Sequence, residues 1–138
     1  MEDLIRTFPD AERAKSLLEM VDIRMKSIKL MEKDRELFAP KIIEEYYESI
    51  LELITAIMSV DGYKTRSDAT GAHIISIEYV RRCKELNGNE IELIKELRKK
   101  RIGIKYYGHC VGSEYLKNKE DSIKTIISKL KIVLAKKL

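Results

Sequence analysis

The chain contains no tryptophan, two prolines, two cysteines and six glycines among its 138 residues. Two cysteines, Cys83 and Cys110, are too few for a disulfide framework or for a four-ligand zinc site. No apolar run is long enough to span a membrane, and no segment resembles a signal peptide. No glycine-rich phosphate loop is present, and no serine or cysteine carries a signature of nucleophilic catalysis. These absences predict a reduced, cytoplasmic protein.

What the chain does contain is an ordinary share of apolar residues, 44%, together with 36% charged residues. A chain of this length buries an apolar core on folding, which argues against intrinsic disorder. We expect one domain that covers residues 1–138. The abundance of Lys, Glu and Ile is typical of a heat-adapted source.

The formal net charge of +4 is distributed unevenly along the chain. Residues 1–90 carry 14 basic and 18 acidic side chains, whereas residues 91–138 carry 13 basic and 5 acidic ones. The basic character therefore belongs to the last third of the chain. Such a bias indicates either an acidic partner, such as a nucleic acid, or a solvated lysine face.

Apolar residues recur at steps of three and four along five segments, which is the spacing of one face of an α-helix. The first segment covers residues 10–37, with Asp10 as its N-terminal cap. The second opens at Ala39 and Pro40, because proline suits a first helical turn, and it stops at Gly62.

The third segment is predicted to start with Ser67 or Asp68 as its cap and to end at Gly88. The fourth is predicted to begin at Asn89, with Glu92 three residues later in the arrangement of a capping box.

The fourth segment continues to Gly108, residues 108–117 are predicted to form a loop, and Asn118 is predicted to cap the fifth segment. No run alternates with period two for long enough to predict a strand. The fold class is therefore all-α, as an antiparallel, up-and-down bundle of about five helices.

The fourth segment carries the most informative charges. Arg98, Arg101 and Lys105 recur at i, i+3 and i+7, beside an apolar stripe that includes Leu97. Arginines at the edge of an apolar face are costly unless an anion meets them. The anion is either a phosphate-bearing ligand or one of the glutamates of the second segment, and both readings stay open.

This window, Leu97 to His109, together with the loop at residues 62–65, resembles the HEPN superfamily (higher eukaryotes and prokaryotes nucleotide-binding domain) over about residues 40–136. The family's motif is an Arg, four to six intervening residues and a His. Arg101 matches the arginine. After four intervening residues this chain has Tyr106 in place of the histidine, while seven residues separate His109 from Arg101.

The resemblance implies a helical bundle that forms a homodimer, with no cofactor or metal. Many family members are metal-independent ribonucleases of toxin–antitoxin or defence systems, and they are often encoded beside a small nucleotidyltransferase. It implies Arg101, Tyr106 and His109 as candidate catalytic residues. Arg98, Arg101, Lys105 and Tyr107 are the candidate ligand-binding residues.

The missing histidine decides which function we expect. Tyrosine has an unperturbed pKa of about 10, so Tyr106 is a poor general base at neutral pH. We therefore expect a HEPN-like domain that binds RNA or a nucleotide, or a partner nucleotidyltransferase, through a basic cleft on the fourth helix. The alternative is a metal-independent endoribonuclease.

Other polar residues have simpler expected roles. His73 is expected to be a partly buried, hydrogen-bonded helix residue. Of the adjacent Tyr46 and Tyr47, one ring is expected to face the core and the other the surface. The two histidines and two cysteines lack the spacing of a zinc motif, so we expect no metal.

Overall fold

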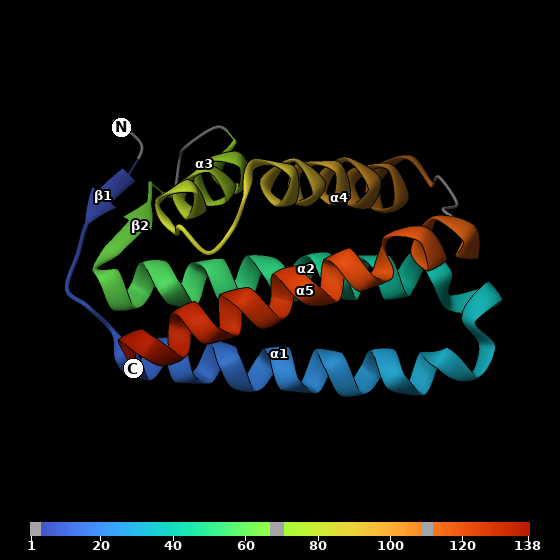
Figure 1. The fold of residues 1–138 in the computed structure, drawn as a ribbon, viewed down its shortest axis with the longest axis horizontal. Coiled ribbons are helices and arrows are strands. Elements are labelled where there is room, and N and C mark those ends of the chain that lie inside the picture. The colour runs from blue at the N-terminus through green and yellow to red at the C-terminus, as the bar shows by residue number, and fades with distance from the viewer. Residues whose placement is uncertain (1–3, 67–70, 109–111) are drawn as a thin grey trace.

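The computed structural model describes residues 4–66, 71–108 and 112–138 (Figure 1). Its elements, in chain order, are β1 (Leu4–Arg6), α1 (Ala11–Met31), a 3₁₀ turn (Glu32–Asp34), α2 (Arg35–Asp61), β2 (Tyr63–Thr65), α3 (Ala72–Tyr79), a 3₁₀ turn (Val80–Arg82), α4 (Gly88–Tyr107) and α5 (Ser113–Lys137). The mostly helical bundle is confirmed. None of the helices in the described ranges is long and apolar enough to cross a membrane.

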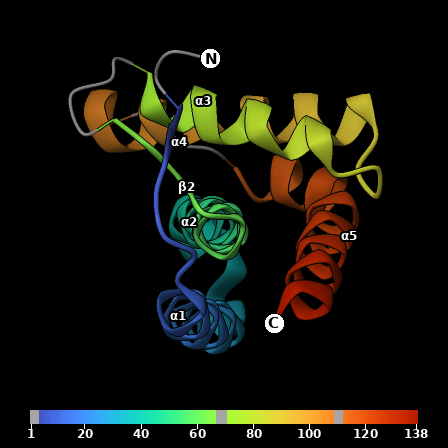
Figure 2. The same ribbon diagram turned by 90° about the vertical axis from the view of Figure 1, so that its left-hand side faces the viewer.

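Helix α2 is the central element of the bundle. It packs against α1, α3, α4 and α5. In Figure 1, α1 runs antiparallel to α2, and so does α4, whereas α5 runs in the same direction as α2. Helix α3 runs across α2, not along it (Figure 2).

A short two-stranded antiparallel sheet was not predicted from the sequence. β1 pairs with β2, and Ile5 lies opposite Lys64 in the register. Each strand has only three residues, which is too short for an alternating pattern to be recognised. This pairing holds the N-terminal segment against the segment that follows α2.

The prediction that one of the two adjacent tyrosine rings faces the surface is wrong. Tyr46 and Tyr47 are 1% and 0% exposed. Two consecutive helical side chains point about 100° apart, and both directions are covered because α2 has neighbours on several sides. The Tyr46 hydroxyl donates to Glu120 of α5 at 2.7 Å.

The boundary between the first two helices differs from the prediction. Asp10 caps α1 as expected, since its side chain accepts from the Arg13 amide at 2.9 Å. However, α1 ends at Met31, and α2 is capped by Asp34, six residues before Pro40. The Asp34 carboxylate accepts from the Leu37 amide, which starts a new helix within the segment predicted as one.

The end of the third helix and the start of the fourth also differ from the prediction. Ser67 and Asp68 lie outside the described residues, and α3 ends at Tyr79, not at Gly88. The capping box of α4 is formed by Asn87 and Glu90, not by Asn89 and Glu92. Both reciprocal bonds, of 2.9 Å each, are present.

Helix α5 begins six residues earlier than predicted, with Gly112 in place of Asn118 at the N-cap position. It starts at Ser113, so Asn118 lies inside the helix and is not its cap. The extra turn is held by tertiary contacts, because Leu116 is fully buried and the Tyr115 hydroxyl donates to Glu96 of α4 at 2.8 Å. Packing of this kind overrides the local signal of a capping residue.

Candidate functional site

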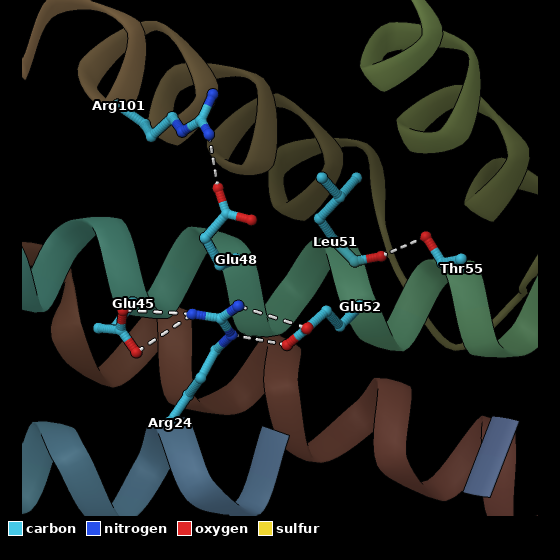
Figure 3. A network of polar contacts seen from close by, with 7 residues as sticks. All are labelled: Arg24, Glu45, Glu48, Leu51, Glu52, Thr55 and Arg101. Atoms are coloured by element: carbon cyan, nitrogen blue, oxygen red, sulfur yellow. Dashed lines mark hydrogen bonds and ion pairs between the residues drawn. The ribbon is translucent and has the colours of Figure 1, made fainter. Parts of the chain in front are cut away.

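The central site lies where α4 faces α2, and Arg101 is its best-defined member. The Nη2 atom of Arg101 lies 2.9 Å from Oε1 of Glu48 on α2, and the two side chains are 12% and 25% exposed. Figure 3 shows Glu48 pointing from α2 toward Arg101. Of the two anions that the sequence left open for these arginines, the glutamate of the second helix is thus confirmed as the neighbour of Arg101.

The ion pair leaves several hydrogen-bonding groups without partners. Oε1 of Glu48, Nε of Arg101 and Nε of Arg98 are buried and have no hydrogen-bond partner among the described residues. The Arg101–Glu48 contact is therefore a contact of charges that lacks the alignment of a hydrogen bond. Buried donors without partners each cost about 1 to 3 kcal/mol.

A second arginine also pairs with carboxylates of α2, and its hydrogen bonds are complete. Arg24 of α1 donates from Nε to Glu52 at 2.7 Å and from Nη2 to the other oxygen of Glu52 at 3.4 Å. Its Nη1 donates to both oxygens of Glu45, at 3.2 and 3.4 Å. All three nitrogens of Arg24 are used (Figure 3). The Arg101 site is incomplete by comparison.

Tyr47 and His73 complete the polar cluster on its α3 side. The Tyr47 hydroxyl and Nδ1 of His73 lie 3.1 Å apart in a hydrogen bond. The guanidinium of Arg101 lies 6.0 Å from the centre of the Tyr47 ring. The expectation that His73 is a partly buried, hydrogen-bonded helix residue is confirmed.

The electrostatic environment keeps both groups neutral at pH 7. Burial raises the pKa of Tyr47 to about 12, and Glu48 adds to this, while Arg98 and Arg101 oppose it. Burial, followed by the charges of Arg101, Arg98 and Lys105, lowers the pKa of His73, with Glu48 opposing. An uncharged imidazole therefore faces a group of cations.

The remaining predicted residues lie at the exposed end of α4. Tyr106 and Tyr107 are 63% and 71% exposed, and Nζ of Lys105 lies 5.6 Å from the centre of the Tyr106 ring. His109 lies outside the described residues. Tyr106 and Tyr107 therefore lie at the solvent-exposed edge of the cluster, which we call its rim. The Nε atoms of Arg98 and Arg101 are buried within the cluster.

Sequence reasoning did not select three members of this cluster as site residues: Tyr47, Glu48 and His73. Glu48 was recognised only as one of several acids able to meet the arginines. His73 stands near the start of α3, far from Arg101 in sequence, and only the crossing of α3 over α2 brings it near. Within the part of the chain that the structure describes, no three His, Cys, Asp or Glu side chains are grouped to hold a metal ion.

The lowered pKa of His73 predicts a pH-dependent stability. The unfolded chain takes up this proton near the ordinary imidazole pKa of about 6.5, while the folded protein resists it. The contribution is therefore present above that pH and is lost as the pH falls through the lowered pKa of the folded state. Urea unfolding at about pH 7.5 and about pH 5.5 should show a loss of stability that His73→Gln diminishes.

His109→Gln is the matched control for this measurement, because it removes the other histidine of the chain. It should leave the loss of stability between the two pH values unchanged. An equal loss in His73→Gln and in the unmodified protein would contradict the assignment.

No protein-family model matches the chain, and a search of the curated proteins finds no significant relative. The fold and the site therefore define only a class: a helical bundle whose central helix holds the Glu48 carboxylate against Arg101 of α4. The function must be argued from that site.

Proposed function

We propose that this chain is a HEPN-like helical domain that binds RNA or a nucleotide through the phosphate, using Arg98, Arg101 and Lys105 of α4. The observation that carries the proposal is the pair of buried Nε–H donors on Arg98 and Arg101 that lack hydrogen-bond partners in the described part of the chain. Phosphate oxygens are strong acceptors for guanidinium groups, and a single phosphate accepts from more than one arginine.

The balance of charge supports an anionic ligand. Three cations of α4 stand near a neutral histidine, and Glu48 is the carboxylate that contacts Arg101. Lys105 is exposed at the rim, where it adds to the field that a phosphate meets on approach. The exposed rings of Tyr106 and Tyr107 lie beside it and offer surfaces for a base to stack on.

The family resemblance supplies the rest of the proposal. A bundle in which α4 carries Arg101 is compatible with it, and the homodimer and the partner nucleotidyltransferase follow from the resemblance alone. Tyr106 stands where the family has its histidine, so binding is favoured over catalysis.

Binding is tested with two probes, a fluorescent short single-stranded RNA and adenosine monophosphate, which separate the two sources of phosphate. Arg101→Ala is expected to weaken binding about tenfold or more, since a charge-assisted hydrogen bond contributes about 1.5 to 3 kcal/mol. Arg98→Ala should act in the same direction. The affinity for RNA should also fall steeply with salt.

Lys99→Ala is the matched control, because Lys99 is an exposed cation between the two arginines in sequence. It should change the affinity less than about twofold, as expected for a single exposed charge. Equal affinities of Arg101→Ala and the unmodified protein would refute the proposed function.

Ribonuclease activity is the second candidate, and the observation that favours it is His73. A neutral imidazole near Arg101 has the protonation state that a general base needs. Incubating the same RNA with the protein in the absence of metal adds a cleavage readout to the binding experiment. Cleavage that His73→Gln abolishes and His109→Gln preserves would favour His73 as the base, whereas cleavage unaffected by Arg101→Ala would exclude this site.

A further inference from the structure

We infer that the Glu48 carboxylate occupies the position of the ligand's phosphate, and that the ligand binds by displacing it from Arg101. This inference rests on the proposed function, and it names the group that limits the affinity of the site. Glu48 would then act as an internal competitor, and removing its charge would strengthen binding.

The geometry of the contact is the first argument. Nη2 of Arg101 meets Oε1 of Glu48 at 2.9 Å, yet that oxygen forms no hydrogen bond among the described residues. The Nε donor of Arg101 likewise has no partner within the described ranges. The carboxylate therefore balances the charge of the guanidinium without accepting hydrogen bonds from it. An anion with more oxygen atoms accepts the hydrogen bonds that Glu48 does not accept.

The contrast with Arg24 is the second argument. Glu45 and Glu52 lie on the same helix as Glu48, and they satisfy the guanidinium of Arg24 through four hydrogen bonds. Carboxylates on α2 are therefore able to accept hydrogen bonds from every nitrogen of a guanidinium group. The incomplete contact at Arg101 is a property of that site, not of the helix.

The position of Glu48 is the third argument. Its side chain is 25% exposed, while its neighbours Tyr47 and Ser49 are fully buried. The helix is thus held in place by the core on both sides of Glu48, and a rotation of this one side chain toward solvent frees Arg101. Displacement requires no movement of the backbone.

A phosphate is the anion that this site favours. Arg98 Nε and Arg101 Nε are two separate donors without partners among the described residues, and the Glu48 carboxylate contacts only Arg101. A phosphate group offers more acceptor oxygens, spread over a larger volume. A simple carboxylate ligand would gain little over Glu48 itself.

The test is Glu48→Gln, which keeps the size of the side chain and removes its charge. Measured with the short single-stranded RNA and with adenosine monophosphate, its affinity for at least one probe should rise about fivefold, the scale of a partly exposed ion pair. Glu45→Gln is the matched control, because Glu45 pairs with Arg24. It should leave both affinities within about twofold of the unmodified protein.

Weaker or unchanged binding by Glu48→Gln, while Arg101→Ala still loses binding, would overturn the inference and leave the proposed function standing. Normal binding by Arg101→Ala would instead refute the proposed function itself. Thermal unfolding of each variant establishes that it is folded. If Glu48→Gln does not fold, Glu48→Asp carries the same test, since its shorter side chain draws the carboxylate back from Arg101 and should also strengthen binding.

Discussion

Arg24→Ala is expected to destabilise the protein by about 2 to 3 kcal/mol. Arg24 holds two carboxylates of α2, Glu45 and Glu52, and the three side chains are only 23%, 21% and 17% exposed. Removing the cation leaves two like charges in a partly desolvated seam between α1 and α2. Removing one partner of a fully buried pair costs about 3 to 5 kcal/mol, and the residual exposure of this site lowers that figure.

Chemical denaturation measures this loss, and Lys15→Ala is its matched control on the same helix. Lys15 pairs with Glu12 at 3.5 Å, but the two side chains are 57% and 88% exposed. Its removal should change stability by less than about 0.5 kcal/mol. If Arg24→Ala lowered the free energy of unfolding no more than Lys15→Ala, the ion pairs of Arg24 would contribute nothing measurable to stability.

A compensating variant separates repulsion from lost packing. Adding Glu45→Gln and Glu52→Gln to Arg24→Ala removes both stranded charges, so part of the lost stability should return. A triple variant as unstable as Arg24→Ala alone would show that the loss comes from the arginine side chain's packing.

Gly62→Ala is expected to destabilise the protein by about 2 to 3 kcal/mol. Gly62 ends α2 in the left-handed region, with φ +83°. A Cβ atom there would lie 2.9 Å from the backbone oxygen of Thr7. The Thr7 amide donates to the Gly62 carbonyl at 2.8 Å. Thr7 therefore cannot shift away from an added Cβ atom without breaking that hydrogen bond.

Gly108→Ala is the control that isolates the backbone strain. Gly108 ends α4 with φ +67°, and a Cβ atom there would meet nothing within 4 Å. It should cost only the left-handed strain, about 1 to 2 kcal/mol, so Gly62→Ala should exceed it. Equal losses in thermal unfolding would mean that the contact with Thr7 costs nothing.

The helical character and three of the helix boundaries were predictable because their causes are local. Asp10 caps α1, and Gly62 and Gly108 end α2 and α4, as their residue types predicted. The starts of α2 and α5 were predicted wrongly, since several residues were able to serve as caps and tertiary contacts selected among them. Leu116, buried in the core, extends α5 past the cap that its sequence offered.

The candidate site was predictable only on one of its helices. Arg98 and Arg101 share a face of α4 because their spacing is helical, and the expectation that they meet either an acid of the second helix or a ligand came from that spacing. Nothing local indicates that Glu48 would reach Arg101 while Glu45 and Glu52 reach Arg24. That division depends on which neighbouring helix lies over each turn of α2.

By itself, the sequence determined a helical bundle, the basic character of the last third of the chain and the pair of arginines on α4. These follow from periodicity, composition and spacing, which act over a few residues. Only the tertiary structure decided that Arg101 meets Glu48, that His73 of α3 bonds to Tyr47 beside them and that two Nε donors have no partner among the described residues. Contacts between helices distant in sequence depend on how whole faces pack, and no local pattern encodes that choice.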